Sequence, residues 1–260
     1  MKPIHILGIL GAATLGAVLL SESKQAAKPP APPARVPKKA TMESAYIPDS
    51  FINGIVDMAE AWKAKGANVE ALDFLKTFNA ESGIKTTPRN KYGYGGLNGM
   101  GKEALKAVGF TGTLDEYLTL SLDQQLAYAR KFLEGQVRSF AGGDYSKITD
   151  GGRLYLSNIF PAYLTRPLDF VITRRGDKNG FYEANQGIDG DAKGYINVAD
   201  MAKFTTRLWN QRKGFAAELS SRVQDAYDRR APAISGDDTL PDLTALDDEP
   251  DFNGPGGDPS

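Results

Sequence analysis

The chain contains no cysteine among its 260 residues, which excludes disulfides, thiolate zinc sites and a cysteine nucleophile. Histidine occurs once, as His5, inside an apolar run, so the remainder of the chain has no imidazole. Serine–histidine–aspartate catalysis and histidine-ligated metal sites are therefore excluded as well. If the protein is an enzyme, its proton transfers have to come from carboxylates, lysine or tyrosine.

A charge imbalance is also lacking, because 31 Lys and Arg residues stand against 32 Asp and Glu residues, for a net charge of −1. A strongly basic chain would indicate nucleic acid as a partner, and this one does not. Apolar residues make up 41% of the sequence, enough for one good core or two small domains.

The N-terminus carries an apolar run, residues 3–20, without Asp, Glu, Lys or Arg. As a helix rising about 1.5 Å per residue, it would span about 27 Å, the thickness of a bilayer core. Residues 1–22 are therefore predicted to form a transmembrane helix. A cleaved signal peptide is the alternative, since Lys2 gives a short basic start.

Two further segments have compositions that do not favour a packed core. Residues 23–44 are rich in proline and basic residues, which is typical of a semi-rigid linker. Residues 231–260 hold eight Asp and Glu, no Lys or Arg, and repeated proline and glycine, which predicts a disordered acidic tail. The folded domain is expected over residues 45–230.

Helical periodicity dominates this domain, so the predicted fold class is mainly α. Apolar residues recur at helical spacing over 51–62, 71–78, 101–108, 122–133, 154–164 and 198–227. The fourth of these stripes begins behind a capping box, Ser121 to Gln124. The stretch DFVITRR, residues 169–175, is the one plausible strand.

Glu81 lies three residues after Phe78 and seven after Phe74, and so shares their helical face. A carboxyl beside aromatic residues loses solvation, which favours the neutral acid and raises its pKa. Cleavage of a glycosidic bond needs such a protonated carboxyl as general acid, as in lysozyme. The alternative interpretation is an ordinary surface glutamate near a helix end.

The residues around Glu81 resemble the lytic transglycosylases of the lysozyme superfamily, of the soluble type related to goose-type lysozyme. In that family a helix ends in Glu-Ser, and a Gly-Leu-Met-Gln turn follows about fifteen residues later. Here ESGI begins at Glu81, and Gly96 and Leu97 stand fifteen and sixteen residues on. The stretches GKEALKAVGF and SLDQQLAYARKFLEG fit the family's next two helices, so the resemblance covers residues 71–135.

The resemblance implies a lysozyme-like fold and a peptidoglycan lytic transglycosylase without a cofactor. Glu81 would protonate the oxygen between MurNAc and GlcNAc and then take the proton of the MurNAc C6 hydroxyl, giving a 1,6-anhydro sugar. A second acid is not required, unlike in hydrolytic glycosidases. Glu103 and Asp115 are the nearest alternatives for a second acid, and both have the pattern of surface or capping residues.

The implied substrate site takes residues from both sides of the loop. Ser82, Gly96 and Leu97 match the family motif, whereas Asn98 and Gly99 stand where the family has Met-Gln. Glycines would let the backbone approach a sugar closely. The candidate sugar-binding residues are Ser82, Tyr94, Gly96, Leu97, Asn98 and Tyr155, with Tyr92 and Tyr163 as further aromatic candidates.

Tyr155 is nominated for the role of the family's later tyrosine, although the surrounding motif is not recognisable. Core packing is the alternative for Tyr155 and Tyr163, and turn packing for Tyr92 and Tyr94. The stretch that contains Tyr155 is similar in general character to phage-encoded members of the family.

A second pattern lies in DGDAKGYINVAD, residues 189–200. Asp189, Asp191, Gly194 and Asp200 fall at positions 1, 3, 6 and 12 of a calcium-loop pattern. Lys193 stands at position 5, where an oxygen ligand belongs, and this costs affinity for a cation. A weak Ca²⁺ site and a metal-free turn of EF-hand type are both open interpretations.

The function expected from these patterns is cleavage of peptidoglycan glycan strands by a membrane-tethered enzyme facing the murein, in a bacterial envelope or a phage virion. The first alternative is a non-catalytic virion structural or glycan-binding protein on the same fold. The second is a calcium-dependent adaptor. A hydrolytic muramidase would use the same substrate and give ordinary reducing ends.

Overall fold

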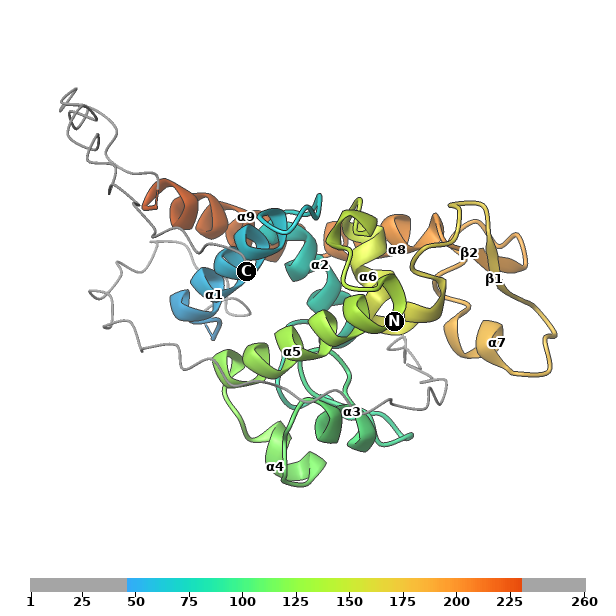
Figure 1. Cartoon of the computed structure of the whole chain (residues 1–260), viewed down its shortest axis with the longest axis horizontal. Helices are drawn as coiled ribbons and strands as arrows, with labels where there is room; N and C mark the ends of the chain where they lie inside the picture. The colour runs from blue at the N-terminus through green and yellow to red at the C-terminus, as the bar shows by residue number, and fades with distance from the viewer. Residues whose placement is uncertain (1–45, 231–260) are drawn as a thin grey trace, which may run out of the picture.

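A computed structural model describes residues 46–230, which form a mainly helical protein (Figure 1). The helix predicted over residues 1–22, the linker over 23–44 and the tail over 231–260 lie outside the described residues. Within residues 46–230, no helix is long and apolar enough to cross a membrane.

The elements follow one another as nine α-helices, two strands and two short 3-10 helices within the described residues. In chain order they are α1 (Asp49–Lys63), α2 (Ala71–Ser82), α3 (Lys102–Ala107), α4 (Leu114–Leu118), α5 (Leu122–Ala141), η1 (Tyr145–Lys147), α6 (Gly151–Ile159), η2 (Pro161–Tyr163), β1 (Val171–Arg174), α7 (Phe181–Asn185), β2 (Tyr195–Asn197), α8 (Asp200–Asn210) and α9 (Lys213–Asp228).

Four predicted helices are confirmed as α1, α2, α3 and α5, and the predicted capping box begins α5. Ser121 Oγ accepts the backbone N–H of Gln124 at 3.2 Å, and Gln124 Oε1 accepts that of Ser121 at 3.0 Å. Two predictions were wrong in extent. The helix expected over 154–164 begins earlier and ends at Ile159, and the single helix expected over 198–227 is two helices, α8 and α9.

The break between α8 and α9 places Arg212 against the end of α2. The Arg212 guanidinium donates to Asn79 Oδ1 and to the carbonyl oxygen of Gly83, at 2.5 and 3.2 Å. Gly83 ends α2 in the left-handed conformation, with φ of 68°. A cation at this position also complements the partial negative charge of a helix C-terminus. Apolar periodicity alone does not mark this break, because it continues on both sides.

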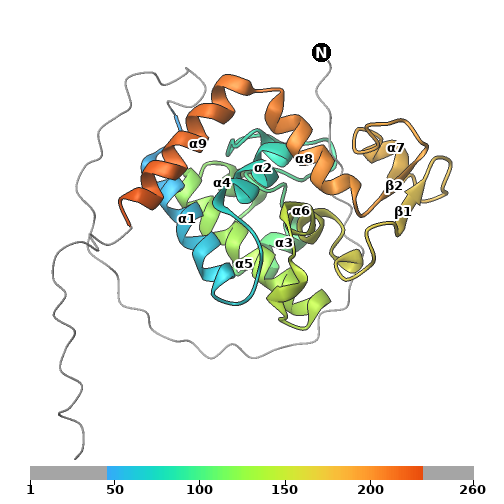
Figure 2. The same cartoon turned by 90° about the horizontal axis from the view of Figure 1, so that it is seen from above.

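The strand predicted over 169–175 exists as β1, but it has a partner that the sequence pattern did not indicate. β1 pairs antiparallel with β2, with an irregular register between Val171 and Thr173. This two-stranded sheet and α7 lie at the opposite end of the protein from α1 and α9 (Figures 1 and 2). Part of the segment interpreted as a calcium loop is therefore strand.

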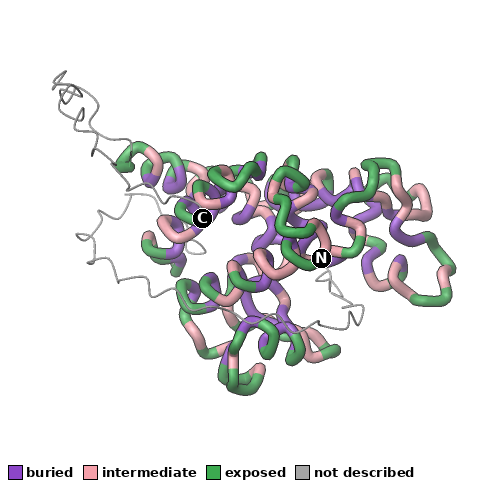
Figure 3. Tube along the Cα trace, in the orientation of Figure 1, coloured by how far each residue is buried: buried purple, intermediate pink, exposed green. Residues whose placement is uncertain are grey.

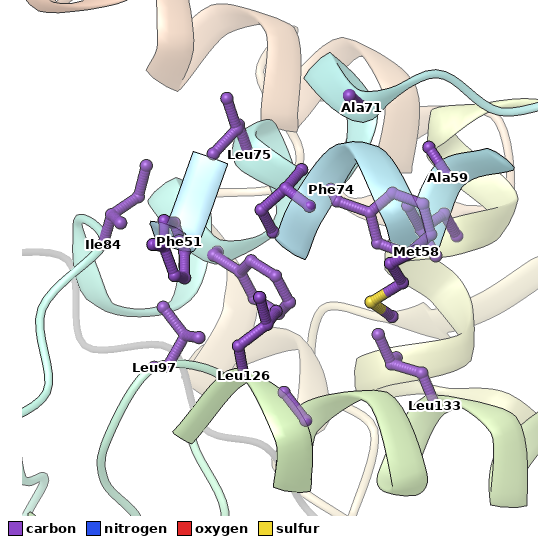
Figure 4. Close-up of a cluster of buried hydrophobic side chains, with 14 of the residues drawn as sticks. Phe51, Met58, Ala59, Ala71, Phe74, Leu75, Ile84, Leu97, Leu126 and Leu133 are labelled. Carbon is purple, nitrogen blue, oxygen red and sulfur yellow. The ribbon is translucent and has the colours of Figure 1, made fainter. Parts of the chain in front are cut away.

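Two clusters of buried side chains meet at α2. The larger cluster contains Phe74, Leu75 and Phe78 of α2 together with residues of α1, α5 and α9. Figure 4 shows Phe74 and Leu75 among residues of α1 and α5. The smaller cluster contains Ala80 of α2 and residues of α6, of the two-stranded sheet and of α8. Figure 3 shows the buried residues running through the middle of the helical body. The last turn of α2, which carries Glu81, thus lies where the two cores join.

The packing of the larger core generates a prediction about stability. Leu75→Ala should lower the free energy of unfolding by about 2–5 kcal/mol, because Leu75 is fully buried and its removal leaves a cavity. Leu168→Ala is the matched control, since Leu168 is 55% exposed and should change stability by less than about 0.5 kcal/mol. Urea unfolding followed by circular dichroism measures both. Equal effects in the two variants would contradict this description of the core.

Candidate active site around Glu81

Glu81 stands at the C-terminal end of α2, with its carboxyl turned partly inward. The residue as a whole is half-buried, but Oε1 is enclosed and makes no hydrogen bond of normal geometry. The hydroxyl of Tyr155, on α6, is likewise enclosed and has no such partner. Two enclosed polar groups that make no hydrogen bond of normal geometry are costly in an apolar junction, and such groups call for a functional explanation.

Burial raises the pKa of Glu81 from 4.5 to about 7. Tyr155 and Asn158 oppose this shift, because their polar groups favour the charged carboxylate, but burial outweighs them. Burial also raises the pKa of Tyr155 well above its usual range, and the nearby Glu81 charge adds to that effect. Tyr155 is therefore a neutral phenol, able to donate a hydrogen bond to an ionised Glu81.

The glycine turn approaches Glu81 at Gly99. A Cβ added to Gly99 would lie 2.8 Å from Glu81 Oε2, and the φ of 66° is one that glycine adopts without strain. The sequence predicted a close approach of this turn to a sugar. In the structure the close approach is to the carboxyl itself.

Asn98 precedes Gly99 in the turn and is only 2% exposed. Its Nδ2 lies 3.5 Å from Asn158 Oδ1, and Asn158 Nδ2 lies 3.4 Å from the backbone oxygen of Asn98. Both contacts are long for hydrogen bonds. The structure therefore brings Glu81, Tyr155 and Asn98 together, and it adds Gly99 and Asn158.

Asn158 was not among the residues nominated from the sequence. It lies three residues after Tyr155 in α6, and residues at this spacing share a helical face. Once Tyr155 is nominated to face Glu81, this spacing is a signal that could have identified Asn158.

The other motif residues hold the turn in place. Ser82 Oγ lies 2.8 Å from the carbonyl oxygen of Leu97 and accepts the backbone N–H of Lys85 at 3.2 Å. The Leu97 side chain is fully buried and points into the larger core (Figure 4). A Cβ on Gly96 would lie 2.5 Å from the Tyr117 ring. Gly96 and Leu97 are both buried, and Gln125 and Ser82 occupy the backbone N–H and carbonyl oxygen of Leu97. Gly96 and Leu97 therefore hold the turn and present no free group to a ligand.

The remaining aromatic candidates are spread over the surface. Tyr94 is half-buried, with its ring against Gly101, and Tyr92 is 52% exposed. Tyr163 packs edge to face against Phe160 at the margin of the smaller core. Tyr92 is thus the most accessible ring of this group.

Neither of two surface hollows in the described part of the chain is lined by Glu81. One, of about 700 Å³, lies along α8 and includes Lys203 and Arg207. The other, of about 540 Å³, is bounded by Tyr46 and by residues 85–87 and 119–122. No carboxylate lines either hollow, so the case for acid–base chemistry comes from the burial of Glu81 rather than from a cavity.

In the segment interpreted as a calcium loop, the ammonium of Lys193 binds the carboxylate of Asp200. Lys193 Nζ lies 2.6 and 2.7 Å from the two carboxyl oxygens of Asp200, and 3.4 Å from Asp191. Asp189 instead accepts hydrogen bonds from the Tyr182 hydroxyl and the Gly194 backbone N–H. Within residues 46–230, no group of three or more acidic, histidine or cysteine side chains is arranged to hold a metal ion. The ammonium of Lys193 thus neutralises carboxylates that a metal would otherwise bind.

Comparison of the chain with protein-family models, with curated proteins and with solved structures finds no match. The function is therefore inferred from the geometry of the chain itself.

The Lys193 contacts predict that a lysine, rather than calcium, stabilises this loop. Lys193→Met should lower the free energy of unfolding by about 1–3 kcal/mol, because it leaves the buried Asp200 carboxylate without its cation. Lys178→Met, which removes an exposed charge, is the control. Millimolar calcium should leave the wild-type melting temperature unchanged. If calcium raises the melting temperature of wild type but not that of Asp189→Ala, calcium displaces the lysine and the prediction is wrong.

The raised pKa of Glu81 predicts a pH-dependent cost to stability. Below pH 4.5 the Glu81 carboxyl is protonated in both the folded and the unfolded chain. Between pH 4.5 and about 7, only the unfolded chain releases this proton. The free energy of unfolding of wild type therefore falls as the pH rises through this range. Glu81→Gln removes this cost and should be more stable than wild type by about 1–3 kcal/mol at pH 8, with no gain at pH 4. Urea unfolding at both values measures the difference, with the exposed Glu103→Gln as control. A Glu81→Gln gain that does not grow with pH would contradict the buried carboxyl.

Proposed function

We propose that this chain is a peptidoglycan lytic transglycosylase on a lysozyme-like helical fold, which cleaves the MurNAc–GlcNAc β-1,4 bond. The observation that supports this most is the Glu81 carboxyl, whose pKa of about 7 keeps much of it protonated at neutral pH. Such a group can give a proton and take one back at the same pH. The resemblance of residues 71–135 to that enzyme family supplies the reaction.

In the first step, protonated Glu81 donates its proton to the glycosidic oxygen as the bond from that oxygen to C1 of MurNAc breaks. GlcNAc leaves as an alcohol, and positive charge develops on the MurNAc ring. Glu81 becomes a carboxylate. Tyr155 and Asn158 face it and favour this charged form, so they would stabilise the carboxylate between the two steps.

In the second step, the C6 hydroxyl of MurNAc attacks C1, and the Glu81 carboxylate takes the hydroxyl proton. The bond between O6 and C1 closes the 1,6-anhydro ring, and Glu81 is protonated again. No water is consumed, so one carboxyl completes the cycle. Deprotonation of Glu81 above pH 7 removes the acid needed for the first step, so cleavage should decline about tenfold per pH unit there.

The surroundings of Asp115 and Glu103, the two alternatives for a second acid, agree with a single-acid mechanism. Asp115 is exposed and paired with Arg89 at 2.5 Å, and Glu103 is an exposed residue in the first turn of α3. Neither has the enclosed surroundings that raise the pKa of a general acid. A hydrolytic muramidase would need a second carboxylate beside the sugar or a water activated in another way.

One observation favours the alternative of a non-catalytic virion structural or glycan-binding protein. Asn98 and Gly99 replace the family's Met-Gln, and Gly99 has no side chain to bind a sugar. The calcium-dependent adaptor gains no such support, since Lys193 holds Asp200. The proposal includes peptidoglycan as the partner and a membrane tether through residues 1–22, so that the domain faces murein in a bacterial envelope or a phage virion.

The decisive test is digestion of purified murein sacculi by wild type and by Glu81→Gln, with mass spectrometry of the released muropeptides. Wild type should release products lighter by one water than hydrolysis gives. Glu81→Gln should lose at least about 10²-fold in rate, because the amide can neither give nor take the proton. Glu103→Gln, which removes an exposed acid, should keep full activity.

Three results would count against this assignment. Ordinary reducing ends would make the protein a hydrolase. Activity that survives in Glu81→Gln would remove Glu81 from the chemistry. Inactivity of folded wild type on several mureins would favour the non-catalytic alternative.

A further inference from the structure

Gln125 is a polar side chain of α5 that is fully buried. Its Oε1 accepts the backbone N–H of Leu97 at 2.8 Å. Its Nε2 donates to the carbonyl oxygens of Tyr117 and Thr86, at 2.9 and 3.1 Å. The amide oxygen and both amide hydrogens are thus bonded to backbone from three separate segments.

The chemistry of these partners fixes the orientation of the amide. A backbone N–H has to meet the oxygen, and two carbonyl oxygens have to meet the NH₂ group. No other side chain of this length offers one acceptor and two donors in neutral form. An ionised glutamate would face the two carbonyls with negative oxygens, and methionine would bond none of them.

Leu97 is held from both sides by these contacts. Gln125 binds its N–H, Ser82 Oγ lies 2.8 Å from its carbonyl oxygen, and its side chain is buried in the larger core (Figure 4). We call these contacts of Gln125 and Ser82 the Leu97 clamp. The chain continues from Leu97 through Asn98 to Gly99, which lies against the Glu81 carboxyl. The clamp therefore ends two residues before that contact.

We propose that Gln125 is a positioning residue, which acts through Leu97 to hold Asn98 and Gly99 over the Glu81 carboxyl. Its catalytic meaning rests on the proposed function, but the positioning itself does not. Without the Gln125 bonds, Leu97 keeps only the Ser82 contact and its buried side chain. What remains between Leu97 and Gly99 is weak, namely the long Asn98–Asn158 contacts and the Gly99 N–H bond to the Gly96 carbonyl oxygen at 3.3 Å. Gly99 can then move away, and water reaches the carboxyl.

The test measures the titration of Glu81 directly, without substrate. Wild type and Gln125→Met are labelled with ¹³C at the glutamate side-chain carboxyl, and the Glu81 signal is assigned by its absence in Glu81→Gln. Gln125→Met should lower the pKa of Glu81 by at least about one unit, because hydration of the carboxyl returns. Amide hydrogen exchange at Leu97 should speed up in the same variant, since its N–H loses its acceptor.

The matched control is Gln124→Met, one residue earlier in α5. Gln124 is exposed, and its side chain serves the capping box at Ser121. This variant therefore also loses a helix contact and some stability, but it should leave the Glu81 pKa and the Leu97 exchange rate unchanged.

Gln125→Glu covers the case in which Gln125→Met does not fold. Protonated glutamate keeps an acceptor for Leu97 and one donor, so near pH 5 its melting temperature should approach that of wild type. At pH 8, ionisation of the introduced glutamate should lower the melting temperature of Gln125→Glu clearly. The melting temperature of the control Gln124→Glu should not depend on pH in this way. A melting temperature of Gln125→Glu that follows the control at both pH values would overturn the clamp.

Two more outcomes separate the hypotheses. Loss of stability in Gln125→Met with an unchanged Glu81 pKa would make Gln125 merely structural and overturn the positioning role. If Gln125→Met lowers the Glu81 pKa but wild type cleaves no murein, the clamp is supported and the proposed function is refuted. In the expected case, murein cleavage by Gln125→Met at pH 7 falls about tenfold or more, and the pH at which activity is half-maximal moves lower.

Discussion

The carboxyl of Glu81 cannot be fully hydrated, and much of the rest of the structure serves this constraint. Gly99 contacts one of its oxygens, the other is enclosed, and Tyr155 faces it from a helix that packs against both α2 and α8. A buried acid is stable only where the surroundings are too rigid to let water in. Here that rigidity comes from the two hydrophobic cores, which meet at the end of α2.

Local sequence patterns predicted four of the helices and one strand, but only part of the site. Helical periodicity and the Glu-Ser turn indicated α2 and Glu81, because both depend on neighbours within a few residues. The contact of Glu81 with Tyr155 joins residues far apart in the chain, and it was nominated only through the family resemblance. Gln125 shows the limit of pattern reading. Its spacing from Leu122 and Ala129 places it on the buried face of α5, but the backbone groups that it binds are visible only in the folded structure.

The C-terminal half was harder to predict for a different physical reason. A break between two amphipathic helices leaves the apolar period intact, so the bend at Arg212 is visible only from its partners Asn79 and Gly83. In residues 189–200, the spacing of carboxylates suits a metal loop, and the one residue against that interpretation is Lys193. Its ammonium binds the Asp200 carboxylate in place of an external cation. The calcium-loop and metal-free interpretations thus differ in the role of a single charged side chain, Lys193.

Asn98 and Gly99 stand where the lytic transglycosylases that the sequence resembles have Met-Gln, and this difference can be related to the same close contact at Gly99. Any side chain at position 99 would place its Cβ 2.8 Å from Glu81 Oε2, and glutamine would also be strained at a φ of 66°. A glutamine at position 99 would therefore require the Glu81 carboxyl to shift and would carry backbone strain. Under the proposed function, this chain would exchange the sugar contact of the family's glutamine for a closer cover over the acid. The exchange favours a raised pKa over tight ground-state binding, and binding energy that is absent in the ground state does not slow the chemical step. A missing sugar ligand is thus compatible with a working catalyst, provided that the glycan strand is held elsewhere along its length.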